Sequence, residues 1–398
     1  MNDLTKGFQR STVTFLNRGR VVCLLAVGFM SGSCVLNAPL AHALQSLESN
    51  EGSAQQRVTV DQVQRIVAND NGERDAKLAQ RLSGLELTER MSAAKRVSLE
   101  QSVRGSKSRS ALVALADASA FLDPPAADLL SNAPPDVSQQ RHMMALTMDY
   151  LNQILPKLPD FYATRTTDGF SREQEAGAIS QEDLSWRKVD SRKVVVTYRD
   201  GKEVINPREW GKHPSHPDGE GLITRGTFGP ILLCVIFDAA HGQMVWDRWE
   251  RGTDGTLAVF GYRVPEDQSH YSAGLHGPLI DSSNAAQGTG YQGEVAIDPA
   301  TGTILRLTVQ ADPPRDSLNR RSDIMVEYGP VVIGGRTYTC PVRSVSISVV
   351  TSMGGLENFL PNVQAPQSTL LNDVTFADYH QFRATSRILT GNIPTSNQ

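Results

Sequence analysis

The sequence predicts an α+β fold, in which a helical region precedes an antiparallel β-sheet with one embedded helix. Between residues 57 and 156 apolar residues recur at helical spacing. Between residues 157 and 390 they alternate with polar residues, and short turns separate the alternating segments. Helices followed by strand after strand are typical of an α+β protein and exclude an array of parallel βαβ units.

The first 43 residues have the pattern of a secretory signal peptide. A basic stretch precedes a short apolar core at residues 21–30, and Ala41-His42-Ala43 provides the small residues at which signal peptidase cuts. The core is too short for a comfortable membrane span. The alternative is a lipid anchor on Cys34, but Ser31 stands where such a site has an aliphatic residue. We therefore expect a periplasmic or extracellular protein.

The remaining composition is that of a soluble, mildly acidic protein. The whole chain has a net charge of −4, and the basic signal segment contributes positive charge that cleavage removes. No basic field is left to bind nucleic acid, and no later apolar run is long enough for a transmembrane segment. Residues 44–56 are polar and predict a flexible tether, and residues 391–398 predict a frayed tail.

The helical region begins after Thr59, a residue type that caps helices. Asp136 and Gln139 have the spacing of a capping box, and the helix that follows is apolar over much of its circumference. That breadth predicts a helix packed between other elements. The other helical faces are Val63, Ile66 and Val67; Leu78, Leu82 and Leu85; Met91, Ala94 and Val97 after a cap at Thr88; and Leu112, Leu115 and Leu122.

Beyond Pro159 the strands come in pairs around turn sequences. Asp200-Gly201 and Gly334-Gly335 are strong two-residue hairpin signals. The predicted strands are residues 161–167, 193–199, 202–205, 244–251, 256–264, 294–297, 303–310, 324–327, 331–333, 336–339 and 342–351. Residues 229–242 are the exception, because Pro230 suits a first helical turn and Gly242 suits a helix C-terminus. We interpret them as a buried helix, with a buried strand as the alternative.

Two cysteines, Cys234 and Cys340, follow the signal segment. An oxidising compartment permits one disulfide between them. The alternative is two separate buried thiols that behave as small apolar residues.

Three motifs bear on chemistry. Residues 288–293 match the dinucleotide fingerprint GxGxxG, but a loop precedes them and a strand follows, so we expect no cofactor. His213 and His216 lie within one Pro-rich loop, where solvated histidines are a better explanation than a metal site. A hydrolase that uses His213, His216 or His270 from such loops is a further hypothesis, although no nucleophile motif supports it.

Aromatic residues provide the candidate binding surface. Phe260 and Tyr262 share one face of a strand, whereas Trp246 and Trp249 are an odd number of residues apart and should face opposite sides. With Phe161 they are candidates to line an apolar cavity over one sheet face. The alternative is a packed sheet core.

The region from Leu158 to about Ile388 resembles the half-barrel scaffold of the periplasmic lipoprotein-localisation carriers. The residues that carry the resemblance are the segments 158–165, 293–298 with Leu305-Arg306, 328–330 and 376–382. The resemblance implies a strongly curved antiparallel sheet around an apolar cavity. The carriers have no helical preface of about 100 residues, so no cargo-binding residue is transferred. The N-terminal stretch, notably residues 115–125, is similar to that of secreted bacterial proteins of the same layout, which carry no function to transfer.

These observations favour an exported, non-catalytic envelope protein that binds a lipid or acyl chain in the concave face of the sheet. A structural or protein-interaction module without a ligand, whose partner is another envelope protein, is the first alternative. The hydrolase is the second.

The signal peptide gives the first testable prediction. When the full chain is expressed in a secreting bacterial host, Edman sequencing of the exported protein should begin at Leu44, because cleavage follows Ala43. An exported protein that starts at Met1, or one acylated at Cys34, would contradict the assignment.

Overall fold

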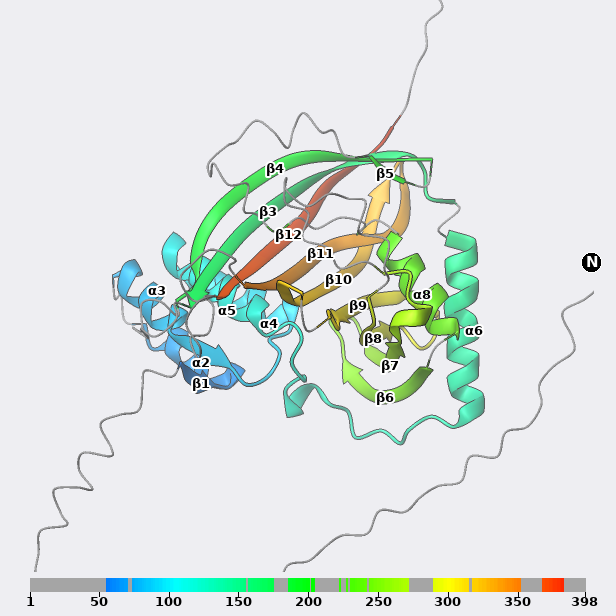
Figure 1. Ribbon diagram of the computed structural model, residues 1–398, viewed down its shortest axis with the longest axis horizontal. Coiled ribbons are helices and arrows are strands. Elements are labelled where there is room, and N and C mark those ends of the chain that lie inside the picture. The colour runs from blue at the N-terminus through cyan, green and yellow to red at the C-terminus, as the bar shows by residue number, and fades with distance from the viewer. Residues whose placement is uncertain are drawn as a thin grey trace, which may run out of the picture. The chain divides into compact units, whose positions relative to one another are not determined.

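A ten-stranded antiparallel sheet forms the largest part of the structure. The computed structural model describes residues 55–70, 74–154, 157–174, 185–200, 202–204, 222, 227, 230–241, 243–271, 289–314, 317–351 and 367–382. Within them the strand order is β5-β4-β3-β12-β11-β10-β9-β8-β7-β6, and every neighbouring pair is antiparallel. The strands are strongly bent, most visibly β3 and β4 (Figure 1). The predicted antiparallel sheet is therefore confirmed.

The strands β3 to β11 follow the alternating segments of the sequence, although several are longer than predicted, and β12 has no counterpart among the predicted strands. Their bounds are β3 (Phe161–Gln174), β4 (Arg187–Arg199), β5 (Lys202–Val204), β6 (Gln243–Arg251), β7 (Thr256–Val264), β8 (Tyr291–Ile297), β9 (Ile304–Ala311), β10 (Asn319–Ile333), β11 (Arg336–Thr351) and β12 (Gln367–Gln381). The hairpin turns are as predicted. Gly334 and Gly335 have φ values of 60° and 84°, and Asp200 has a φ of 50°. Such left-handed backbone matches the right-handed twist of paired strands.

Among the described residues, the N-terminal region contains the helices α2 (Val60–Ala68), α3 (Asp75–Ser83), α4 (Ala93–Ser102) and α5 (Ser106–Ala118). Thr59 caps α2 as predicted. Several details of the prediction are wrong. Leu85 lies in a short strand, and the Thr88 hydroxyl donates to the Val58 carbonyl oxygen, while Ser92 caps α4. Met91 precedes α4, and Leu122 follows the end of α5. The strands β1 (Gln56–Val58) and β2 (Leu85–Leu87) form a small parallel sheet, so the predicted tether ends one residue early.

The long helix α6 (Val137–Ile154) begins with the predicted capping box. The Gln139 N–H donates to Asp136 at 2.8 Å, and the Asp136 N–H donates to the Gln139 side chain at 2.9 Å. Only one stripe of the helix is buried, namely Met143, Thr147 and Leu151. Met148, on the other side, is 41% exposed. The helix therefore covers a single surface, and the prediction that it is sandwiched is wrong.

The helix α8 (Pro230–His241) confirms the embedded helix. It contacts β6 and β7, and Figure 1 draws it beside α6. The described residues also contain two one-turn 3-10 helices, η1 (Ala126–Asp128) and η3 (Glu266–Gln268). Side chains from α6 and α8, such as Val235, form one buried cluster with alternate residues of β7 to β10, such as Phe260 and Val295.

The two faces of the sheet bury different elements. On β10, Val326 belongs to the cluster beneath α6 and α8, whereas the neighbouring Met325 packs with Val113 and Ala114 of α5. Because successive strand residues point to opposite faces, α5 and the α6–α8 pair lie on opposite sides of the sheet. No helix among the described residues is both long and apolar enough to span a membrane.

An ion-pair cluster joins the segment before α4 to the sheet. Glu250 on β6 is only 4% exposed and accepts hydrogen bonds from Arg90 at 2.5 Å and from Arg306 at 2.7 and 2.9 Å. Arg248 donates to Glu250 at 3.1 Å and to both oxygens of Glu294 at 2.7 and 2.8 Å. We call these five residues the Glu250 cluster. Three guanidinium groups surround two carboxylates, so both acids remain ionised.

The Glu250 cluster predicts a pH dependence of stability. Burial opposes ionisation, but Arg306 and Arg90 outweigh it and lower the pKa of Glu250 from 4.5 to about 2. A carboxyl whose pKa is lowered by folding stabilises the folded state above the unfolded pKa, and this contribution, roughly 3 kcal/mol, is lost as pH falls toward 2. The free energy of unfolding in urea should therefore fall between pH 5 and pH 3, and Glu250→Gln should weaken that dependence. Asp254→Asn, in the exposed β6–β7 turn, is the control. An equal pH dependence in wild type and Glu250→Gln would contradict the assignment.

Candidate functional site

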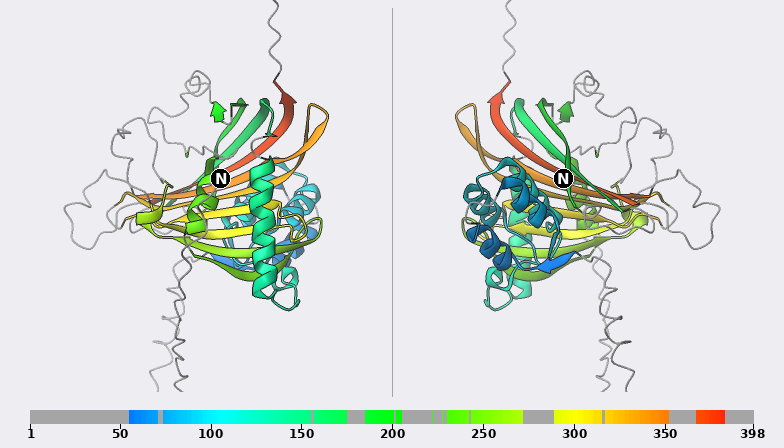
Figure 2. Two further views of the ribbon diagram at one scale, coloured as in Figure 1. Left: turned by 90° about the vertical axis from the view of Figure 1, so that its right-hand side faces the viewer. Right: turned by 90° about the vertical axis from the view of Figure 1, so that its left-hand side faces the viewer.

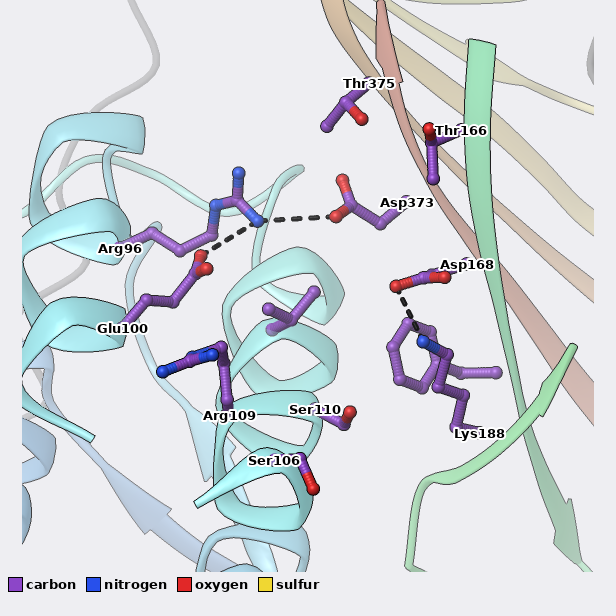
Figure 3. Close-up of a pocket in the computed structure, with 12 residues that line it drawn as sticks. Arg96, Glu100, Ser106, Arg109, Ser110, Thr166, Asp168, Lys188, Asp373 and Thr375 are labelled. Atoms are coloured by element: carbon purple, nitrogen blue, oxygen red, sulfur yellow. Dashed lines mark hydrogen bonds and ion pairs between the residues drawn. The ribbon is translucent and has the colours of Figure 1, made fainter. Parts of the chain in front are cut away.

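A polar cleft lies between the N-terminal helices and the sheet. It has a volume of about 330 Å³ and is walled by α4, α5, β3, β4 and β12 (Figure 3). Its size is at the lower end of the range for small-molecule sites. The lining residues are Arg96, Glu100, Ser106, Arg109, Ser110, Val113, Thr166, Asp168, Phe170, Lys188, Asp373 and Thr375.

Secondary-structure spacing places these side chains. Arg96 and Glu100 are four residues apart on α4, so they share one side of the helix and form an ion pair at 3.1 Å. Thr166 and Asp168 are two residues apart on β3 and therefore share one face of the sheet. The strand register sets Asp373 directly beside Asp168.

The charges around the cleft are nearly balanced. Arg96 also pairs with Asp373 at 3.4 Å, and Lys188 pairs with Asp168 at 2.8 Å. Figure 3 shows Arg96 turned toward Asp373 and Lys188 turned toward Asp168, whereas the guanidinium of Arg109 points away from the strands. Arg96 Nε is buried and has no hydrogen-bond partner among the described residues. The cleft therefore offers cationic groups, carboxylates and hydroxyls, above an apolar floor of Val113 and Phe170.

A second hollow continues the cleft along α5. It has a volume of about 370 Å³ and shares Ser106, Ser110, Phe170 and Lys188 with the first. Trp186 lines its far part, and the Arg172 guanidinium lies 4.8 Å from the centre of the Trp186 ring. The two hollows form one groove beside α5.

Beneath the cleft, a second ion-pair cluster holds α5 against the sheet. Arg343 on β11 donates to Asp117 of α5, to Asp373 at 3.1 Å and to Glu327 at 3.3 Å. We call these four residues the Arg343 cluster. Burial opposes the charge of Arg343, but the three carboxylates outweigh it and raise the pKa of the guanidinium. Because Asp373 belongs to this cluster and also lines the cleft, the same contacts fix the cleft wall.

Four of the five aromatic residues that were predicted to line a cavity pack together, but the two tryptophans are oriented differently from the prediction. A β-bulge between Trp246 and Arg248 places Trp246 and Trp249 on the same face, with ring centroids 4.7 Å apart, so the prediction that they face opposite sides is wrong. They pack with Phe260 and Tyr262 in the cluster beneath α6 and α8. Phe161 belongs to a different cluster, with Tyr198 and Cys340.

Both cysteines are free thiols, so the optional disulfide is not formed. Cys234 on α8 is partly buried, and Cys340 on β11 is buried in the cluster that contains Phe161. Burial raises the pKa of both, that of Cys234 to about 11 and that of Cys340 to about 12. Both are therefore protonated and unreactive at neutral pH.

The histidine motifs have mixed outcomes. His213 and His216 lie outside the described residues, whereas His270 is described and pairs with the buried Asp238. No group of three or more His, Cys, Asp or Glu residues that could bind a metal is found in the described part of the chain. The strand β8 begins at Tyr291, within the GxGxxG match, which confirms that a strand follows this motif.

No residue of the cleft was a candidate in the sequence. One feature of the sequence could have indicated the cleft. Thr166, Asp168 and Phe170 are two residues apart and share one strand face, so that face is not purely apolar. The partners come from distant segments, since Arg96 and Asp373 are 277 positions apart. Without homologues or a fold, the sequence alone does not bring them together.

Comparisons of the chain with protein-family models, with curated proteins and with solved structures find no match. The resemblance to the lipoprotein-localisation carriers therefore stays a prediction.

The Arg343 cluster predicts a large loss of stability on substitution. Arg343→Met leaves the buried Asp117 without its cation and leaves Asp373 with Arg96 alone, which should lower the free energy of unfolding by about 3–5 kcal/mol. Arg336→Met, at the exposed start of the same strand, should change it by less than about 0.5 kcal/mol. Urea denaturation at pH 7 measures both. Equal effects of the two substitutions would show that the cluster does not stabilise the fold.

Proposed function

We propose that this is an exported binding protein whose ligand is a small zwitterionic solute, such as a free amino acid, bound in the polar cleft. The cleft carries the proposal because it collects both signs of charge around one space of about 330 Å³. A ligand with separate cationic and anionic groups can pair with both. Export is supported by the signal-peptide pattern of the first 43 residues.

Physical chemistry favours a zwitterion over an ion of one sign. Arg96, Arg109 and Lys188 are matched by Glu100, Asp168 and Asp373 in the lining. An anion alone would meet three carboxylates, and a cation alone would meet three cationic groups. Lys188 is exposed and its ion pair with Asp168 lies at the surface, where such pairs are weak, so a ligand carboxylate can compete for it.

The apolar ligand expected from the sequence is the second candidate. The observation that favours it is the pair Trp246 and Trp249, which is only partly buried although it lies against the apolar cluster. Phe260 and Tyr262 are already fully buried against α6 and α8. An acyl chain would therefore contact the two tryptophans of edge strand β6. In this candidate the mature protein carries a lipid from the envelope.

Calorimetric titration with glycine, glutamate, lysine and phenylalanine tests the leading proposal. At least one of these amino acids should bind the full chain. Lys188→Ala should then weaken binding about tenfold or more, because it removes a charge-assisted hydrogen bond. Arg187→Ala, on the adjacent exposed position outside the cleft, should leave the affinity unchanged.

The same experiment separates the two candidates. If none of the four amino acids binds, the zwitterion proposal fails. Mass spectrometry of an organic extract of the purified protein then tests the second candidate, which requires a lipid that Trp246→Ala releases.

A further inference from the structure

A histidine is oriented by a buried carboxylate on the side of the sheet that carries α8, away from the cleft. Asp238 of α8 is 1% exposed. Its Oδ1 lies 2.6 Å from Nδ1 of His270, and its Oδ2 accepts the His270 backbone N–H at 2.9 Å and the Tyr291 hydroxyl at 2.8 Å. His270 follows η3, so α8, β8 and the β7–β8 connection meet at this point.

These contacts fix the state of the imidazole. Burial opposes ionisation of Asp238, but hydrogen bonds from His270 and Tyr291 outweigh it and lower the pKa of the carboxyl. An ionised carboxylate accepts a proton-bearing nitrogen, so Nδ1 of neutral His270 carries the hydrogen and Nε2 carries the lone pair. The His270 side chain is 68% exposed, and Nε2 has no partner within the described part of the chain.

Among the described residues, the surroundings of His270 offer an apolar contact but no nucleophile. Phe237 is 57% exposed, and its ring centre lies 5.3 Å from that of His270, edge to face. Cys234 is the nearest thiol, but its Sγ lies 3.7 Å from Asp238 Oδ2, and the thiol is protonated at neutral pH. The Ser269 hydroxyl donates to the Thr289 carbonyl oxygen at 2.6 Å. None of these described groups can serve as the nucleophile, a role that water can take.

We propose that His270, oriented by Asp238, is the general base of a weak esterase activity toward small esters with an apolar acyl group. A buried carboxylate on Nδ1 with an accessible Nε2 is the arrangement that serves as the base in acyl-transfer enzymes. Phe237 provides the contact for the acyl group. The activity is independent of amino-acid binding in the cleft.

The reaction balances without any cofactor. Nε2 of His270 removes a proton from water while the water oxygen bonds to the ester carbonyl carbon. The tetrahedral intermediate then collapses, the bond from carbon to the alkoxide oxygen breaks, and the imidazolium returns its proton to that oxygen. The products are one carboxylic acid and one alcohol. Asp238 keeps its charge throughout and stabilises the imidazolium.

The test uses the full exported chain and p-nitrophenyl butyrate, with release of p-nitrophenol as the readout. His270→Gln should lower kcat/KM about a hundredfold, the scale of general-base catalysis. Because the side chain is largely exposed, this substitution should leave the fold intact. His380→Gln, which changes another exposed histidine, should keep the wild-type rate.

Two further variants separate positioning from structure. Asp238→Asn should lower kcat with KM unchanged, and ¹⁵N NMR of the histidine ring should show that the Nδ1–H tautomer of His270 is no longer dominant. Phe237→Ala should raise KM instead. The proposal would be overturned if His270→Gln left the rate of ester hydrolysis at the wild-type value. It would also be overturned if His380→Gln lowered that rate as much as His270→Gln does. Either result would hold whatever the NMR spectrum shows.

Discussion

Buried ion pairs between the helical region and the sheet are the interaction on which the rest of the structure depends. Arg90 and Asp117 come from the helical region, and their partners Glu250 and Arg343 come from β6 and β11. Removing such charges from water is costly, and the cost is offset only when partners and hydrogen bonds surround each group. The helical region and the sheet must therefore meet in one register, because a shift of either would leave several charges unpaired.

This constraint explains why two unlike surfaces occur on one sheet. On the α5 side, strand positions such as Glu327 and Arg306 bear charge, and the gap beside α5 becomes a polar cleft. On the other side, neighbouring positions such as Val326 and Leu307 are apolar and pack beneath α6 and α8. Gly302 permits the close approach of α6, since its φ of 72° suits glycine and a Cβ there would lie 2.3 Å from the Leu146 backbone. The Asp238–His270 pair lies where α8 meets the first residue of β8, Tyr291.

The sequence predicts local features well and long-range chemistry poorly. The hairpin at Gly334-Gly335 and the capping box at Asp136 are confirmed because neighbouring residues determine them. The relation of Trp246 to Trp249 is predicted wrongly because a single bulge reverses the alternation, and nothing in the local pattern marks it. The Arg343 cluster combines residues from α5, β10, β11 and β12, so only the fold reveals that these charges are matched.

Native-state hydrogen exchange tests this account most directly. If the ion pairs join the helical region to the sheet as one cooperative unit, the slowest amides of α5 and of β11 should exchange with the same free energy of opening, and denaturant should lower both with the same slope. Exchange of α5 at a clearly lower free energy than β11 would show that the helical region opens alone, and would contradict the account.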